Sequence, residues 1–308
     1  GCETMIAVLG MTSIISYICH YIGAFFQWIL QNEPPVQTIP HITSILFFIL
    51  CVKTGLPSLK PAARFIELSR VLCIVMLFLQ RIVQKIVDQL LMSLPSLPDR
   101  AGRQKHVRAV FVSVLHIAYP TLVLILTYCW SHKVSTWTFP ISVLAVESII
   151  KVTVSLMNYS LFLIDARRES FWEKLDDYVY YIRATGNTLI HCCGLLLFLN
   201  GCWILLFESG SVLRAVFMCA NAYFKIWRGA KQGWAAYLAR QKDVRMMKGF
   251  PEASAEMLNE RGDVCAICAS EMTSARVTGC GHCFHGVCLR KWLYVKELCP
   301  MCRTDLRL

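Results

Sequence analysis

Long apolar segments alternate with short polar ones over the first 228 residues of the chain. Four of them reach or approach the about 20 apolar residues that a membrane-spanning helix requires: Met5 to Leu30, Ala109 to Trp130, Phe139 to Ile164 and Leu189 to Phe207. Three more give a weaker signal because they are short or charged: Ile39 to Val52, Leu68 to Val87 and Val212 to Trp227. The pattern predicts six or seven crossings, with a helix lying in the membrane interface as the alternative for the last segment.

Composition supports a membrane protein. Of the 308 residues, 56% are hydrophobic and only 17% are charged, unlike a soluble domain. The net charge of +11 does not indicate nucleic-acid binding, because the basic residues flank the apolar segments and form no single patch on a soluble domain. The expected partner of this part of the chain is the lipid bilayer, and no nucleic acid is expected.

Basic residues mark one side of the membrane. The polar segments 100–108, 165–185 and 225–248 contain clusters of Lys and Arg, whereas the loops around Lys133 and Arg214 contain one each. Cytosolic loops are enriched in Lys and Arg, so we expect the three clusters and the C-terminal region in the cytosol. The basic loop from Lys53 to Arg70 fits this orientation badly.

One apolar segment contains two opposite charges. Glu147 and Lys151 lie four residues apart between Phe139 and Ile164, so their side chains can pair on one helix face. Such a pair could couple ion movement in a transporter. Alternatively, it could stabilise helix packing or line a ligand cavity. This alternative is favoured because a single ion pair is weak support for a transport path.

The last fifth of the chain carries eight metal-ligand residues in four close pairs: Cys265, Cys268, Cys280, His282, His285, Cys288, Cys299 and Cys302. Structural zinc takes four sulfur or nitrogen ligands, and a Cys-x2-Cys turn directs two thiolates at one ion, so eight ligands predict two Zn²⁺. A disulfide framework would leave both histidines without a role. Spacing alone does not decide which pairs share an ion.

Metal is also needed for folding in this region. From Asp263 to Leu308 only a handful of large apolar side chains is available, among them Ile267, Phe284 and Leu289. Zinc in small domains contributes on the order of 10 kcal/mol of apparent binding free energy, which becomes folding free energy. Because protein ligands fill all eight places, a water-activating metal is not expected, and the module should bind rather than hydrolyse.

The array from Cys265 to Arg303 resembles the RING finger of ubiquitin ligases, in the class with histidine at both central positions. The resemblance implies interleaved pairs, with Cys283 as an extra thiol that is not a ligand. The two implied sites are Cys265, Cys268, His285 and Cys288, and Cys280, His282, Cys299 and Cys302. It also implies ligase activity without a covalent catalytic residue: the finger holds a conjugating enzyme charged with ubiquitin and orients the donor for attack by a lysine.

Four residues match the surface with which that family recruits its partners. Ile267, Trp292 and Pro300 resemble the apolar groove that receives the conjugating enzyme, and core packing is the alternative for Trp292. Arg303 follows the last ligand, where the family often places a basic residue that contacts both the conjugating enzyme and ubiquitin. A solvated surface arginine is the alternative for Arg303.

The segment from Glu173 to Gly186 combines an acidic start with an aromatic cluster. Together with residues 207–211, 264–268 and 289–294, it closely resembles the family of multi-spanning ubiquitin ligases named for a translocation in renal carcinoma on chromosome 8. The resemblance implies an endoplasmic reticulum membrane protein with a cytosolic finger, whose partners are a ubiquitin-conjugating enzyme, ubiquitin and membrane-protein substrates.

The same resemblance bears on sterol binding and on the extent of the chain. In the family, the sterol-sensing region lies further toward the N-terminus, so a sterol is a doubtful partner for these residues. The chain begins at Gly1 without methionine or a signal sequence, which is consistent with a fragment of a longer protein.

The expected fold is mainly α: a polytopic helical membrane domain followed by a small two-zinc cross-brace RING finger. We place the membrane domain at 1–228, a cytosolic amphipathic connector and linker at 229–262 and the finger at 263–308.

Two functions are considered. One is a membrane-embedded RING-type ubiquitin-protein ligase that directs ubiquitin to membrane or membrane-proximal substrates for degradation, and the other is a membrane receptor or transporter whose finger is only a protein-interaction module. The four recruiting residues favour the ligase.

Overall fold

The computed structural model describes residues 4–30, 39–94, 99–130, 138–168, 172, 174–207, 216, 219–220, 222–254, 256–258, 264–272, 274–293, 296 and 298–306. It is mainly α-helical with a small C-terminal finger, which confirms the predicted fold class. The chain forms two compact units, each of which is described by itself: Gly1–Leu163 with Ile182–Trp227, and Ile164–Tyr181 with Arg228–Leu308.

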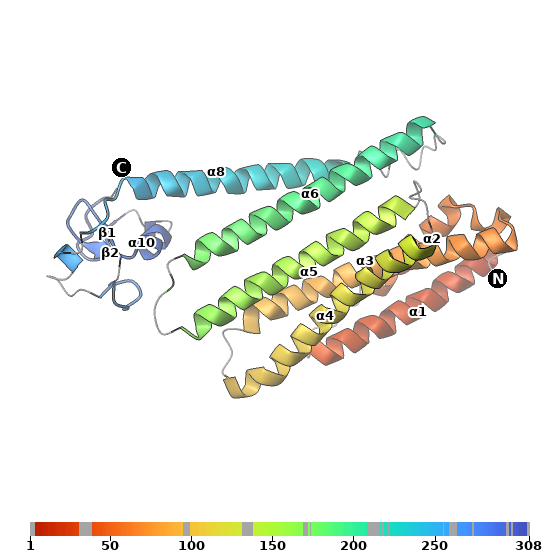
Figure 1. Cartoon of the computed structure of the whole chain (residues 1–308), viewed down its shortest axis with the longest axis horizontal. Coiled ribbons are helices and arrows are strands. Elements are labelled where there is room, and N and C mark those ends of the chain that lie inside the picture. The colour runs from red at the N-terminus through yellow and green to blue at the C-terminus, as the bar shows by residue number, and fades with distance from the viewer. Residues whose placement is uncertain are drawn as a thin grey trace. The chain divides into compact units, whose positions relative to one another are not determined.

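The first unit is built from helices (Figure 1). They are α1 (Met5–Leu30), α2 (Ile39–Lys53), α3 (Pro61–Ser93), α4 (Asp99–Trp130) and most of α5 (Thr138–Ala166) and α6 (Leu175–Phe207), together with a short 3-10 turn, η1 (Leu56–Ser58), and a π-helix, η3 (Ala222–Trp227). The π-helix covers the last six residues of the predicted segment from Val212 to Trp227, of which residues 212–215, 217–218 and 221 lie outside the described residues.

Four helices are long and apolar enough to cross a membrane, over Met5–Ile29, Arg103–Cys129, Thr138–Ala166 and Leu175–Phe207. They contain the four strong segments of the sequence, and the chain is a multi-pass membrane protein. Within the described part of the chain, α2 supplies only a shorter apolar helix, Ile42–Lys53. The total of six or seven crossings stays a prediction.

Two of these helices begin earlier than the apolar pattern indicated. α4 begins at Asp99 rather than Ala109, and α6 begins at Leu175 rather than Leu189. The basic residues of 100–108 and Arg183 are therefore helical and do not lie in loops, because a helix can extend beyond the hydrocarbon layer while its charged side chains reach water.

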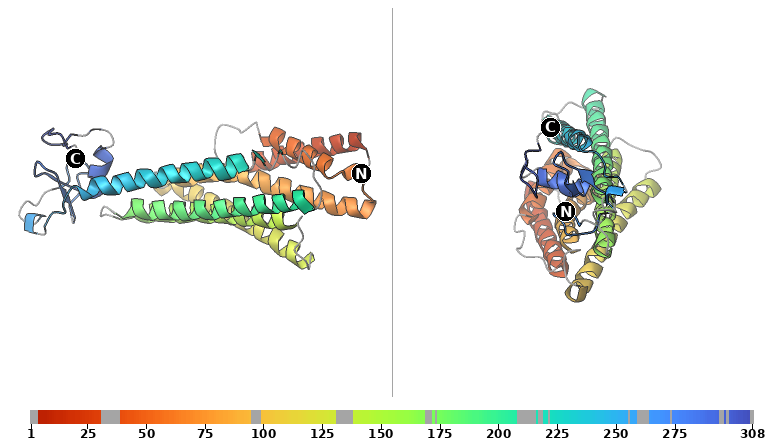
Figure 2. Two further views of the ribbon diagram at one scale, coloured as in Figure 1. Left: turned by 90° about the horizontal axis from the view of Figure 1, so that it is seen from above. Right: turned by 90° about the vertical axis from the view of Figure 1, so that its left-hand side faces the viewer.

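Apolar side chains join the first helices of the bundle. Val8 of α1, Phe47 of α2 and Val75 of α3 belong to one buried cluster, and Figure 2 shows α1 and α2 side by side. α5 joins through a second cluster, in which its Ala145 packs with Val123 of α4. Because the helices also expose many large apolar side chains, the outer faces of the bundle suit contact with lipid.

α5 and α6 approach closely at a glycine. A β-carbon added to Gly186 of α6 would lie 2.5 Å from Val154 Cγ2 of α5, so the contact requires a residue without a side chain. Small residues at helix contacts are common in membranes, where dispersion contacts rather than water exclusion hold helices together.

The second unit contains α8 (Arg228–Lys248) and the finger. In the finger, β1 (Arg276–Val277) pairs antiparallel with β2 (Cys283–Phe284), and α10 (Gly286–Leu293) follows.

Candidate metal centre

The fold gathers the eight Cys and His residues into two groups of four. Within each group the ligand atoms all lie within 4.8 Å of one another. The groups are Cys265, Cys268, His285 and Cys288, and Cys280, His282, Cys299 and Cys302. This is the interleaved arrangement that the RING resemblance implied, and Cys283 lies in β2, outside both groups.

The first Cys-x2-Cys turn has a backbone that suits ligation. The Ala269 N–H donates to the Cys265 carbonyl at 2.7 Å, and the Cys265 N–H donates to the Ser270 carbonyl at 3.0 Å. Ala269 closes the turn with φ 55°, a left-handed conformation that alanine adopts only at some cost. The turn therefore holds the thiols of Cys265 and Cys268, two of the three in the first group, close together.

The last Cys-x2-Cys turn repeats this geometry. The Arg303 N–H donates to the Cys299 carbonyl at 3.0 Å, the Cys299 N–H donates to the Thr304 carbonyl at 2.9 Å, and Arg303 has φ 59°. Two segments far apart in the finger thus form the same turn, one for each group. Arg303 has a backbone role in this turn, and its side chain is exposed.

His285 is oriented toward the first group by a backbone contact. Its Nε2 lies 3.1 Å from the Glu271 carbonyl oxygen, an acceptor, so Nε2 carries the proton and donates. Nδ1 is then left with its lone pair, 3.2 Å from Cys268 Sγ. Ligating histidines commonly use the second ring nitrogen in this way, and Nδ1 is the atom that would meet a metal.

His282 serves the second group with the same atom. Its Nδ1 lies 3.3 Å from Cys280 Sγ and 3.7 Å from Cys299 Sγ. Tetrahedral zinc with ordinary bond lengths places nitrogen and sulfur ligands about 3.5 Å apart, so these separations match a shared ion.

The clustered cysteine sulfurs also favour a bound cation. Burial, and then the neighbouring Cys265 sulfur, raise the pKa of Cys288 well above its usual range. Burial opposes ionisation of Cys280 as well, but several hydrogen bonds, the first from the Thr278 hydroxyl 3.2 Å from its sulfur, together lower the pKa of Cys280 to about 7. Clustered thiolates repel one another unless a metal neutralises them, and the Cys and His donors fit zinc. The two groups could therefore hold the two predicted zinc ions.

The finger's apolar core extends beyond the ligand array. Phe284, Leu289 and Leu293 are buried together with Phe250, which follows α8 and is only 2% exposed. Sequence reasoning missed Phe250 because it placed this residue at the end of a connector. A lone aromatic directly before Pro251, after a polar helix, is the signal that could have found it.

The start of the predicted polar linker is also part of the finger. Glu252 forms an antiparallel bridge with Arg276, and the Val277 N–H donates to the Pro251 carbonyl at 2.9 Å. The Arg276 guanidinium also donates to Glu252 Oε1 at 2.7 Å. Residues 251–253 thus act as an edge strand beside β1, because β1 would otherwise leave its backbone groups unpaired.

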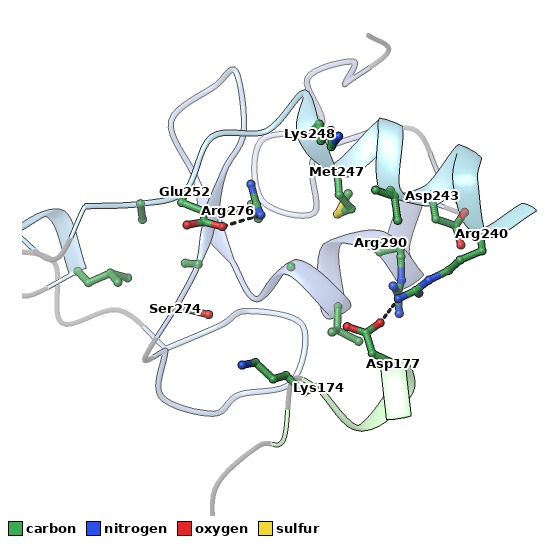
Figure 3. Close-up of a pocket in the computed structure, with 16 residues that line it drawn as sticks. Lys174, Asp177, Arg240, Asp243, Met247, Lys248, Glu252, Ser274, Arg276 and Arg290 are labelled. Atoms are coloured by element: carbon green, nitrogen blue, oxygen red, sulfur yellow. Dashed lines mark hydrogen bonds and ion pairs between the residues drawn. The ribbon is translucent and has the colours of Figure 1, made fainter. Parts of the chain in front are cut away.

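The finger contacts α8 and the first turn of α6 through ion pairs. Asp176 Oδ2 lies 3.2 Å from an Arg290 nitrogen and 3.3 Å from Lys291 Nζ, and Asp177 pairs with Arg240 of α8. Figure 3 shows Asp177 and Arg240 pointing toward each other across an open cleft of about 560 Å³, whose other walls are the finger and α8. Five basic and three acidic residues line the cleft, and most of its charges are paired there.

Of the four predicted recruiting residues of the finger, Arg303 is exposed and the other three are half-buried. Ile267 is half-buried at the edge of its core, and Pro300 is half-buried in the last turn. Trp292 is also half-buried, and its indole N–H donates to the Leu298 carbonyl at 2.7 Å. This bond ties α10 to the strand segment before Cys299 and leaves part of the indole ring accessible.

Comparisons with known proteins agree with this architecture. Residues 1–234 match the family model described as TRC8 N-terminal domain, and residues 263–303 match the Ring finger domain. The chain is 48% identical over 309 residues to Protein TRC8 homolog of Drosophila melanogaster, covering 98% of this chain and 38% of that protein. It is 41% identical over 310 residues to human E3 ubiquitin-protein ligase RNF139, covering 99% and 46%.

A more distant relative shares the same extent. Human RING finger protein 145 is 29% identical over 311 residues, covering 99% of this chain and 47% of that protein. The chain thus spans less than half the length of these curated relatives. No solved structure matches it.

Proposed function

The chain belongs to the TRC8 family, and on that premise we propose that it acts as a membrane-embedded RING-type ubiquitin-protein ligase. The observation that carries the proposal is the finger with its two interleaved groups of four Cys and His side chains. The name of the human relative, an E3 ubiquitin-protein ligase, supports the same activity. The alternative of a receptor or transporter whose finger is only an interaction module is not favoured.

The zinc ions have a structural role in this proposal. We assign Cys265, Cys268, His285 and Cys288 to one ion, and Cys280, His282, Cys299 and Cys302 to the other. Four protein ligands complete each tetrahedron, so neither ion is left to activate water. The metal instead fixes the two Cys-x2-Cys turns and the surface between them.

Ubiquitin transfer then depends on orientation. The finger would bind a conjugating enzyme that carries ubiquitin as a thioester, and the lysine amine of a substrate attacks that thioester while the conjugating enzyme's cysteine leaves as a thiolate. Holding the donor in one reactive geometry accelerates this step without a covalent intermediate on the ligase. No catalytic residue is needed on the finger itself.

We propose Ile267, Trp292 and Pro300 as the apolar contact for the conjugating enzyme, and Arg303 as the contact to both that enzyme and ubiquitin. All four side chains are at least partly accessible. The left-handed backbone of Arg303 is fixed by the zinc turn, so the starting position of its guanidinium depends on the second metal site. A guanidinium donates to carbonyls on two partners at once, which suits this role.

The proposed setting is the endoplasmic reticulum membrane, with the finger in the cytosol and membrane proteins as substrates. Clusters of Lys and Arg near α4, α6 and α8 support this orientation. Reduced cysteines and ubiquitin also belong to the cytosol. We retain 1–228 as the membrane domain, 229–262 as the connector and 263–308 as the ligand-bearing finger, to which Phe250 adds a core residue.

The deciding experiment mixes the purified chain with ubiquitin, activating enzyme, ATP and a panel of conjugating enzymes. We expect ubiquitin chains with at least one conjugating enzyme, and their loss in His285→Ala. Arg303→Ala should keep two bound zinc ions and lose most transfer. Absence of chains with every conjugating enzyme, or undiminished activity of His285→Ala, would overturn the proposal.

A further inference from the structure

The membrane unit contains a buried cluster of charges that ubiquitin transfer does not use. The Glu147 side chain of α5 is 0% exposed and contacts three cations. Lys151 Nζ lies 3.0 Å from Oε1, Lys225 Nζ lies 2.8 Å from Oε2, and Arg81 of α3 also contacts Oε2. The pair Glu147 and Lys151 expected from the sequence therefore exists as part of a cluster of four charges.

Positive charge exceeds negative charge in this cluster. Among the residues that the structure describes, Glu147 is the carboxylate that pairs with the three cations, so two positive charges remain. Asp88 of α3 is a nearby second carboxylate: it accepts hydrogen bonds from Gln84 and from Ser155, one turn beyond Lys151 on α5, and it interacts electrostatically with Lys151. It offsets at most one of the two charges, so the cluster keeps a net positive charge. An unpaired charge inside a bilayer is costly, so the cluster favours a further anion.

The cluster lies at the depth of the hydrocarbon layer. Lys151 is 13 residues from the start of α5 and 15 from its end, Thr138 and Ala166, or about 20 Å from each at 1.5 Å per residue. Its ammonium group is held by Glu147 and does not extend toward the interface. A lipid phosphate in the headgroup layer or a phosphate ion from water is therefore a poor counterion, because neither enters the hydrocarbon.

Two of the cations are open to the outside of the described bundle. The side chains of Lys151 and Lys225 are 37% and 31% exposed, against 18% for Arg81. Lys225 lies in the π-helix Ala222–Trp227. π-helices are rare in proteins, and those that occur are often found at functional sites. The two ammonium groups thus present positive charge to whatever covers this face.

The cavity beside the cluster does not hold the anion. Its volume is about 10 Å³, and its walls include Gln80, Gln84 and His116. Each contributes a buried acceptor without a hydrogen-bond partner: Gln80 Oε1, Gln84 Oε1 and, because Nδ1 contacts the Val112 carbonyl, His116 Nε2. Arg81 and Lys151 also line the cavity, but the space fits one water-sized group at most and is too small for a carboxylate. An anion must therefore approach Lys151 and Lys225 from the outside of the described bundle.

We propose that Lys151 and Lys225 form a binding site for the carboxylate of an Asp or Glu within the membrane-spanning helix of a partner protein. A spanning helix is the source that can deliver a carboxylate to this depth, and pairing removes the cost of charge for both sides. For a ligase, the site defines a substrate class: membrane proteins with an acidic residue inside a span. That last step rests on the proposed function, whereas the binding itself does not.

Binding can be measured without ubiquitin. The labelled full chain is placed in lipid nanodiscs with a labelled polyleucine peptide that spans the bilayer and carries one central Asp, and energy transfer between the labels reports association. Matched peptides carry Asn or Leu at the same place. We expect the Asp peptide to bind about tenfold more tightly than the Leu peptide.

Variants test whether the preference for the Asp peptide over the Leu peptide depends on the two lysines. Lys151→Met and Lys225→Met should each reduce this preference, and the double variant should abolish it. Lys151→Arg should keep the preference because the positive charge remains. Lys85→Met, which removes an exposed cation one turn from Arg81 on α3, is the matched control and should bind like the parent. Bound zinc and thermal unfolding establish that each variant is folded.

Three results would overturn the proposal: equal binding of the Asp and Leu peptides, equal binding of the Asp and Asn peptides, or a preference that survives in the folded double variant. Loss of ligase activity alone has no bearing on it, because the assay contains no conjugating enzyme. A chain that binds the Asp peptide but transfers no ubiquitin would refute the proposed function and leave the binding site standing.

Discussion

The finger and the membrane bundle handle buried charge in opposite ways. In the finger, six cysteines and two histidines converge in two groups of four, and their zinc-binding thiolates need a bound cation to balance their charge. In the bundle, one carboxylate, Glu147, is surrounded by three cationic side chains from the same unit. The finger therefore depends on a component from outside the chain, while the bundle carries its countercharges within its own helices and has positive charge to spare.

Removal of zinc should give the largest difference in stability between the finger and the bundle. A strong chelator removes on the order of 10 kcal/mol of stabilisation from a finger of this kind. We expect the amides of 264–306 to lose protection from hydrogen exchange while those of α5 keep theirs. Mass spectrometry of the exchanged peptides measures both, and loss of protection in α5 would show that the bundle depends on the metal as well.

A pair of variants gives the same test without a chelator. His285→Ala should lose the first ion, whereas Cys283→Ser changes a thiol outside both groups and should retain two zinc ions per chain. Metal analysis reports the count directly.

Glu147→Gln should cause the largest loss in the bundle. The change leaves Arg81, Lys151 and Lys225 without their carboxylate, and breaking a buried ion pair typically costs about 3–5 kcal/mol. We expect a lower unfolding temperature of the chain in detergent with two zinc ions still bound. The control is Glu67→Gln, which removes a pair with Arg70 within one helix, worth about 0–1 kcal/mol. Equal losses from the two variants would contradict the importance of the buried cluster.

These contacts show what local sequence could and could not predict. The four close ligand pairs of the finger and the pair of Glu147 with Lys151 are set by spacings of two to four residues, so the pattern alone indicated them. Which ligand pairs share an ion followed from the RING resemblance and not from the spacing. The contacts of Arg81 and Lys225 with Glu147 join residues 66 and 78 positions apart, and no periodicity reports such a distance. The long apolar segments predicted the existence of helices, but the early starts of α4 and α6 lie in polar sequence where hydropathy carries no signal.

Phe250→Ala tests where the finger begins. The side chain is 2% exposed and packs in the finger's core, although it precedes the matched Ring finger residues 263–303. Deleting a buried phenylalanine costs about 3–5 kcal/mol, so we expect exchange protection in 264–306 to fall while zinc remains bound. An unchanged finger would mean that metal alone determines its fold. Phe224→Ala, an exposed aromatic in the other unit, is the control.

Gly186→Ala tests close packing in the bundle, where no metal compensates. The new β-carbon would lie 2.5 Å from Val154 Cγ2, and overpacking of this kind costs about 1–3 kcal/mol. Val154→Ala in the same chain should restore most of the lost stability, as measured by thermal unfolding in detergent. Gly10→Ala, which meets nothing within 4 Å, should have little effect. A failure of Val154→Ala to compensate would place the cost elsewhere than in this contact.

Asp176→Asn should have the smallest effect, because its carboxylate is partly open to solvent. The Asp176 side chain is 34% exposed, and its partners Arg290 and Lys291 are 14% and 65% exposed. Exposed pairs contribute about 0–1 kcal/mol and are screened by salt, so the variant should differ from the parent only at low ionic strength. Chemical denaturation of the finger, followed by exchange of 264–306 at low and high salt, measures the difference. A loss as large as that of Glu147→Gln, and independent of salt, would mean that the charges around the finger are as strongly coupled as those inside the bundle, and the contrast between the two regions would fail.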